Sequence, residues 1–172
     1  MKMMYNKRIL ADFIIVSNDG TKFPCHRAVM ATRSDVMMAM MEADMREKKD
    51  STLNLQFNGE IIKAFVDFFY DEELDKELIA REIGSFLDLS EAYNLTSLKL
   101  LTENVALGRL KCENMLEMYF LADKYKAKEL KAAAELFIRS NKKYLDSQDL
   151  QETLRGADKE QALEIIRILS RE

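Results

Sequence analysis

The chain has 172 residues, a net charge of −4 and 33% charged residues, which suits one domain or one domain with a small appendage. The mildly acidic balance argues against nucleic acid as the main partner, and no run approaches the roughly 18 apolar residues of a membrane span. The two cysteines, Cys25 and Cys112, provide neither a disulfide framework nor a zinc cluster. A reducing compartment, nucleus or cytoplasm, is therefore expected.

Residues 12–25 carry the pattern of a β-hairpin. Residues 12–17 form a β-branched and aromatic run, and the turn signal Asn18-Asp19-Gly20 follows, in which glycine can take a positive φ. Phe23 precedes a proline, which disfavours the helical region, so residues 21–25 are expected to be extended.

Two short helices and a further strand are expected after the hairpin. Residues 26–32 and 34–42 have helical patterns, and Ser34 is a suitable N-cap for the second helix. Residues 52–57 alternate with a period of two, which predicts a strand with one buried face.

After Gly59 the chain is expected to be helical almost to its end, because apolar residues recur at spacings of three and four. The expected helices cover residues 61–69, 79–94, 98–107, 112–121, 128–141, 146–154 and 159–169. Gly108 is expected to follow the third of these helices as its C′ residue. The predicted fold class is α+β of mainly helical content, subdivided into residues 1–108 and 109–172.

A cysteine hydrolase would have to use Cys25 and His26, because His26 is the chain's one histidine. Adjacent residues on a strand point to opposite faces, so we expect a buried cysteine and a structural histidine instead, with no catalytic, metal or cofactor site. Asp12 is expected to be buried and to accept hydrogen bonds from backbone N–H groups or from His26. The acidic stretch 71–75 lacks the spacing of an EF-hand and is expected to be a solvated loop.

The segment 36–47 is rich in methionine. Five of the chain's 11 methionines lie there: Met37, Met38, Met40, Met41 and Met45. On a helix these side chains cover more than one face, so some must pack in the core. Methionine is also common at adaptable binding surfaces, and we expect part of this stripe to be an interface.

Several separated motifs together resemble a BTB/POZ domain. Residues 11–16 and 23–34 resemble the Asp-led first hairpin of that family and its F-x-x-H-[KR] stretch. Residues 64–70 resemble its F-x-x-x-[IL]-x-[FY]-[IL]-Y helix, and residues 87–99 resemble its later helix pair. The resemblance spans about residues 10–107 and implies a small sheet flanked by helices.

A second set of motifs resembles the helices that follow the BTB domain in the MATH-BTB group of cullin-3 adaptors. These motifs are Cys112-Glu113-Asn114-Met115, residues 119–125, Leu130-Lys131 and Phe137-Ile138. The resemblance implies that residues 109–172 are a three-box, the opening part of a BACK region.

The resemblance implies a non-enzymatic adaptor of a cullin-3 RING ubiquitin ligase, whose substrate would bind through a region not in this chain. Met45-Arg46-Glu47 fits the φ-x-E motif with which the family contacts the N-terminal domain of cullin-3. The cullin-binding residues implied are Met40, Met41, Met45, Glu47 and Tyr119.

The resemblance also implies a homodimer, with Met4, Leu10 and Val29 at its interface. The alternative is a BTB scaffold that acts by self-association, or by recruiting transcriptional corepressors, without binding cullin. The same fold supports both roles, so the fold alone does not choose between them.

Overall fold

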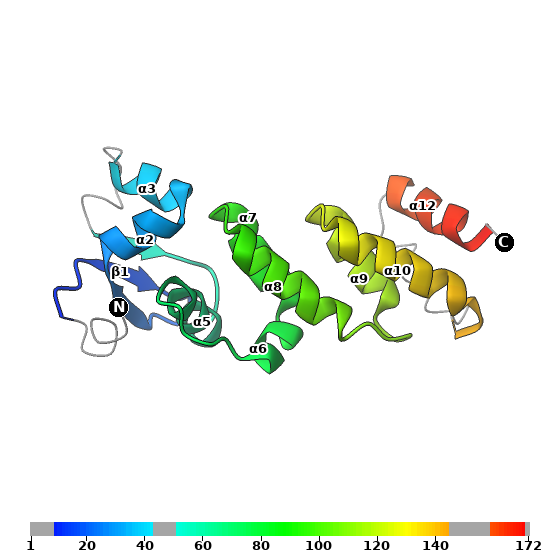
Figure 1. Ribbon diagram of the computed structural model, residues 1–172, viewed down its shortest axis with the longest axis horizontal. Helices are drawn as coiled ribbons and strands as arrows, with labels where there is room; N and C mark the ends of the chain where they lie inside the picture. The colour runs from blue at the N-terminus through cyan, green and yellow to red at the C-terminus, as the bar shows by residue number, and fades with distance from the viewer. Residues whose placement is uncertain (1–8, 43–50, 145–158, 171–172) are drawn as a thin grey trace. The chain divides into compact units, whose positions relative to one another are not determined.

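The computed structural model describes residues 9–42, 51–144 and 159–170 (Figure 1). The chain divides into two compact units, residues 1–102 and 103–172. The division lies inside helix α8, Thr96–Leu107, a few residues before the subdivision that the sequence predicts.

The first unit contains a three-stranded sheet. Strand β1, Phe13–Val16, pairs antiparallel with β2, Lys22–Cys25, and parallel with β3, Thr52–Asn54, in the order β2-β1-β3. Gly20 in the hairpin turn has a φ of 82°, which favours glycine. The predicted hairpin and the predicted strand are therefore confirmed, the strand with fewer residues than expected.

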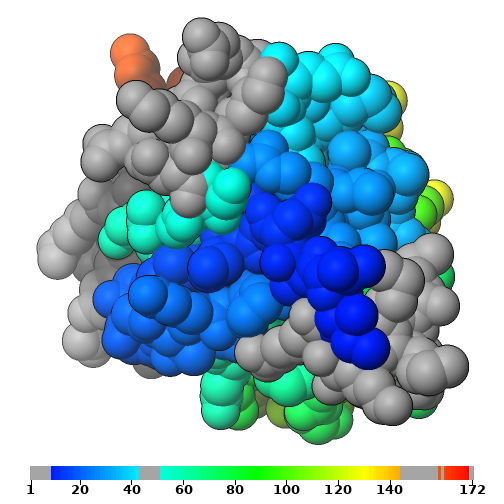
Figure 2. All heavy atoms as spheres, turned by 90° about the vertical axis from the view of Figure 1, so that its left-hand side faces the viewer, coloured from blue at the N-terminus to red at the C-terminus, as the bar shows by residue number. Residues whose placement is uncertain are grey.

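The rest of the first unit, where the structure describes it, is mainly helical. Its helices are α2 Arg27–Arg33, α3 Asp35–Glu42, α5 Gly59–Phe69, α6 Lys76–Arg81, α7 Ile83–Ala92 and the start of α8. Helices α2 and α3 pack against each other, and Figure 2 shows their residues at the surface of this unit beside the hairpin. The mainly helical α+β class is confirmed.

The prediction of a single helix over residues 79–94 is wrong, because α6 and α7 are separate helices. Glu82 lies between them with φ −124° and ψ 35°, outside helical geometry. Ile79 and Ile83 are nevertheless both buried. Apolar spacing of three and four continues across one non-helical residue, so the pattern does not distinguish one helix from two.

The core of the first unit is rich in aromatic side chains. Phe65 lies with its ring centroid 5.2 Å from that of Phe69 and 5.2 Å from that of Tyr93. The largest fully buried side chains here also include Phe13, Ile15, Met30, Met37, Ile62, Phe86 and Leu87. Burial of these rings and branched chains fixes the sheet and helices around one centre.

The second unit contains helices α9 Met115–Lys124, α10 Lys128–Ser140, the 3-10 helix η1 Lys142–Tyr144 and α12 Lys159–Ser170. Its core brings together buried residues of α9, α10 and α12: Met115, Leu116, Tyr119, Ala134, Ile138, Ile165 and Ile168. The helix predicted over residues 146–154 lies outside the described residues. Of the helices that the structure describes, none is long and apolar enough to cross a membrane.

Candidate functional site

Ser34 fixes the start of the methionine-rich helix α3. Its Oγ accepts a hydrogen bond from the backbone N–H of Met37 at 3.1 Å, and its hydroxyl donates to the carbonyl of Tyr93 at 2.7 Å. Ser34 therefore caps α3 and also attaches it to Tyr93, the C-cap residue of α7.

The methionines of α3 divide between the core and the surface. Met37 is fully buried, whereas the exposed fraction of Met38 is 38% and Met40 and Met41 are half-buried. The helix is therefore anchored through one methionine and presents the other three, at least in part, to solvent. Met45 and Glu47, the expected φ-x-E residues, lie outside the described residues.

The residues expected at a dimer interface lie before β1 and on α2. Leu10 is 81% exposed and has a φ of 61°, and Val29 on α2 is half-buried. Met4 lies outside the described residues. An apolar side chain as exposed as Leu10 is available for contact with another protein.

His26 connects the segment before β1 to the end of α5. Its Nε2 lies 2.8 Å from the carbonyl oxygen of Ile9, which can only accept, so Nε2 carries the proton. Nδ1 lies 2.6 Å from the hydroxyl of Tyr70, and the backbone N–H of His26 donates to the same hydroxyl at 3.0 Å. The ring of the histidine thus has a structural partner at each nitrogen.

Asp12 holds the start of α2. Its Oδ1 accepts a hydrogen bond from the backbone N–H of Arg27 at 2.9 Å. The Arg27 guanidinium in turn stacks over the Phe13 ring, 5.2 Å from its centroid. The expectation that Asp12 is buried is wrong: the residue directly precedes the central strand β1 and is exposed. The hydrogen bond described for the Asp12 carboxylate comes from the backbone N–H of Arg27, not from the His26 side chain.

Cys25 is not placed to act as a nucleophile. The side chain is buried, and its Sγ lies 3.6 Å from the carbonyl oxygen of Phe13. Burial, followed by the negative charge of Asp12, raises the pKa of Cys25 to about 12, so the thiol stays protonated near neutral pH. Within the described parts of the chain, no group of three or more His, Cys, Asp or Glu side chains could hold a metal ion.

Tyr119 is expected from the sequence to contact cullin, and the structure does not place it on an accessible surface. Only 2% of the residue is exposed, and its ring packs in the core of the second unit. Its hydroxyl donates to Glu164 at 2.7 Å, and Lys131 Nζ lies 5.3 Å from the ring centroid. Burial raises the pKa of Tyr119 to about 12. The tyrosine therefore holds α9 to α12 and does not present its ring to a partner.

Sequence reasoning did not predict a cavity of about 690 Å³ in the first unit, to which three separate segments contribute. No single segment carries a motif for it. The acidic stretch 71–75, which the sequence predicts to be a solvated loop, contributes Asp71, Glu72, Glu73 and Leu74 to the lining of the cavity.

The amino-acid sequence of the chain matches a known protein family and several known proteins. Residues 1–110 match the BTB/POZ domain. The chain is 26% identical to Kelch-like protein 23 of Mus musculus over 149 residues, which is 86% of this chain and 26% of that protein. It is also 26% identical to BTB/POZ domain-containing protein At1g21780 of Arabidopsis thaliana over 167 residues, 96% of this chain and 51% of that protein. The chain thus spans about a quarter of the length of the first relative and about half of the length of the second.

Proposed function

The chain belongs to the BTB/POZ domain family, a family of protein-interaction modules, and from this premise we propose that it is a substrate adaptor that binds the N-terminal domain of cullin-3. The observation that supports this most is the exposure of Met38, Met40 and Met41 on a helix whose start is fixed by Ser34. Flexible thioether side chains on a rigid helix suit a pocket of a partner protein.

The choice of cullin-3 as the partner rests on the resemblance of the sequence to cullin adaptors. In that resemblance Met45 and Glu47 follow the methionine helix as a φ-x-E motif. An apolar side chain would fill a pocket of cullin and a carboxylate would meet donors beside it. Residues 109–172 would extend this surface as a three-box, and the substrate would be recruited through another region or protein.

Calorimetry with the purified cullin-3 N-terminal domain tests the proposal. We expect the wild-type chain to bind, and Met38→Glu and Glu47→Lys to weaken binding by about 2 kcal/mol each, roughly 30-fold in Kd. Leu100→Glu is the matched control, because it places the same charge at an exposed apolar position of α8, outside residues 109–172 and away from the methionine helix in the sequence. It should leave binding unchanged.

Two results would contradict the adaptor proposal. One is the absence of any binding heat for a wild-type chain whose circular dichroism shows that it is folded. The other is unchanged binding by both Met38→Glu and Glu47→Lys. In either case the self-association scaffold becomes the better hypothesis, since it needs no cullin surface.

A further inference from the structure

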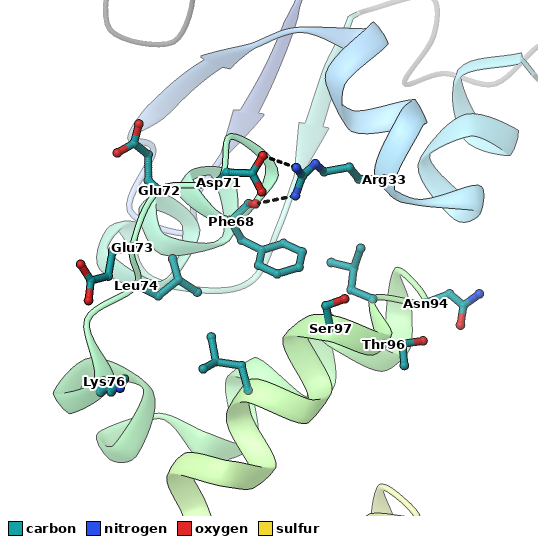
Figure 3. Close-up of a pocket in the computed structure, with 12 residues that line it drawn as sticks. Arg33, Phe68, Asp71, Glu72, Glu73, Leu74, Lys76, Asn94, Thr96 and Ser97 are labelled. Atoms are coloured by element: carbon teal, nitrogen blue, oxygen red, sulfur yellow. Dashed lines mark hydrogen bonds and ion pairs between the residues drawn. The ribbon is translucent and has the colours of Figure 1, made fainter. Parts of the chain in front are cut away.

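The cavity of about 690 Å³ lies wholly within the first unit (Figure 3). Its walls come from the end of α2, the end of α5 with the loop that follows, the start of α6, and the α7–α8 connection with the first turns of α8. The volume is in the range of about 300–1,000 Å³ that is usual for ligand sites. Its lining includes none of the residues assigned above to cullin contact, so an inference from it stands independently of the proposed function.

The floor of the cavity is apolar. Four of the residues that line it are Phe68, Leu74, Leu95 and Leu101. Figure 3 shows the Phe68 ring and the Leu74 side chain projecting into the space between the α5–α6 loop and α8. Such a floor stabilises a bulky apolar group by removing it from water.

Two helix ends shape the cavity through their backbone. Asp71 and Asn94 both line it, and they have φ angles of 60° and 52°. Each follows the C-cap residue of a helix, α5 and α7 respectively, and turns the chain there. The walls are therefore set by backbone hydrogen bonds as well as by side chains, which favours a cavity that exists before a ligand arrives.

The rim of the cavity carries more negative than positive charge. The lining contains Asp71, Glu72 and Glu73 against Arg33 and Lys76. Arg33 forms an ion pair with Asp71 and donates to the Phe68 carbonyl at 3.4 Å, so the charges of Arg33 and Asp71 offset each other. In Figure 3 Glu72 and Glu73 point outward from the loop, away from the Phe68 ring. A cation next to a buried apolar group would meet these carboxylates at the mouth of the cavity.

We propose that this cavity is a docking site for a segment of a partner protein in which a bulky apolar side chain stands beside a lysine or arginine. The apolar side chain occupies the floor formed by Phe68, Leu74 and Leu101. The neighbouring cation lies at the acidic side of the rim, near Glu73. An acidic neighbour in the same position would be repelled there.

Titration of three short peptides, followed by NMR of the methyl groups of the full chain, tests this inference. The probes are acetyl-Ser-Phe-Arg-Ser-amide, its Arg-to-Glu analogue and its Phe-to-Ala analogue. The first peptide should shift the methyl signals of Leu74, Leu95 and Leu101. The Glu analogue should bind about three- to fivefold more weakly, since an exposed ion pair contributes little, and the Ala analogue about 30-fold or more weakly because the apolar burial is lost.

Two variants connect these shifts to the cavity. Glu73→Lys should remove the preference for the Arg peptide, whereas Glu117→Lys, at an exposed position on α9 outside the cavity, should keep it. Ser97→Trp should fill the cavity from the exposed first turn of α8 and abolish the leucine shifts. The inference is overturned if the leucine methyls do not shift, if the Arg and Glu peptides bind equally, or if Ser97→Trp binds as the wild type does.

Discussion

Asp19 joins the hairpin turn to the start of α5. Its Oδ1 accepts hydrogen bonds from the Ser17 hydroxyl at 2.6 Å and from the backbone N–H of Thr21 at 2.9 Å, and its Oδ2 accepts from the N–H of Gly59 at 3.1 Å. These bonds, with that from Ser17 contributing most, hold the pKa of Asp19 well below its usual value. One exposed carboxylate thus connects two elements that are 40 residues apart.

This pKa shift predicts a pH dependence of stability. The pKa of Asp19 is lower in the folded chain than in the unfolded chain. The contribution of Asp19 to the free energy of unfolding is therefore fully present above the pKa of the unfolded chain, about 3.9, and is lost as the pH falls through the pKa of the folded chain. Asp19→Asn should lower the melting temperature at pH 7 and flatten the loss of stability below about pH 4. Thermal melts at a series of pH values measure both effects. In the partner variant Ser17→Ala, the Asp19 carboxyl should titrate at higher pH by NMR; an unchanged titration would refute this assignment.

A second prediction at the residue scale concerns the hydrogen bond between His26 and Tyr70. His26→Phe removes the described ring partners of the Tyr70 hydroxyl and of the Ile9 carbonyl. We expect a loss of about 0.5–1.5 kcal/mol in the free energy of unfolding, the usual net contribution of a hydrogen bond, because the Tyr70 hydroxyl keeps the bond from the His26 backbone N–H and Ile9 is exposed. Urea denaturation measures it. The double variant with Tyr70→Phe should lose less than the sum of the two single variants, and strict additivity would contradict a direct interaction.

Three helices end in the same way without glycine. After α5, α7 and α9 the left-handed residues are Asp71, Asn94 and Lys126, with φ of 60°, 52° and 53°. At the end of α9, for example, the N–H of Ala127 donates to the carbonyl of Ala122 at 2.8 Å, and that of Lys126 to Asp123 at 3.1 Å. This is the hydrogen-bond pattern of a Schellman motif. A left-handed lysine carries a steric cost that asparagine and aspartate carry to a smaller extent.

Lys126→Gly should therefore stabilise the protein. Glycine adopts the left-handed conformation without a Cβ penalty, and after the larger entropy of the unfolded chain is subtracted the expected gain is about 0.5–1 kcal/mol. Lys128→Gly is the control, because this exposed lysine lies inside the first turn of α10 and the change there should destabilise by a similar amount. Chemical denaturation of both variants checks the opposite signs. A loss of stability in Lys126→Gly would show that its side chain matters more than its backbone.

These helix ends show which elements the sequence could predict. The hairpin and the helices α2, α3 and α10 follow from hydrophobic periodicity and turn signals and lie close to the bounds that the sequence predicts. Helix α9, Met115–Lys124, lies three residues later in the chain than the predicted range 112–121. Gly108, the expected C′ residue of α8, does not take a positive φ in the structure. The true left-handed positions carry Asp, Asn and Lys, and the φ of such a residue depends on hydrogen bonds that periodicity does not encode.

At the scale of the whole molecule, the sequence predicted the family and the surface helix but not how exposed each residue is. Separated BTB-like motifs identify the fold because each constrains a different part of it. The burial of Tyr119 and the exposure of Asp12 depend on packing between elements, which no local pattern reports. The cavity beside Phe68 was missed for the same reason, since its walls come together only when the chain folds.

The self-association of the chain can also be tested on the whole molecule. BTB domains mediate dimerisation, and this chain exposes Ile9 and Leu10 together in the segment that His26 holds before β1. Two adjacent exposed apolar side chains on an anchored backbone are suited to pairing with a second copy. We therefore predict a homodimer in which Leu10 and Val29 contribute to the interface.

Light scattering across micromolar concentrations should give twice the chain mass of 20.0 kDa for the wild type. Leu10→Asp should shift the protein toward the monomer, because a carboxylate buried in an apolar interface loses its hydration without a partner. Leu136→Asp, at an exposed apolar position of α10, introduces the same charge away from the predicted interface and should keep the dimer. A wild-type mass that stays at 20.0 kDa, or a dimer equally weakened by both variants, would refute the interface. Because the assay contains no cullin, it tests self-association separately from the adaptor proposal.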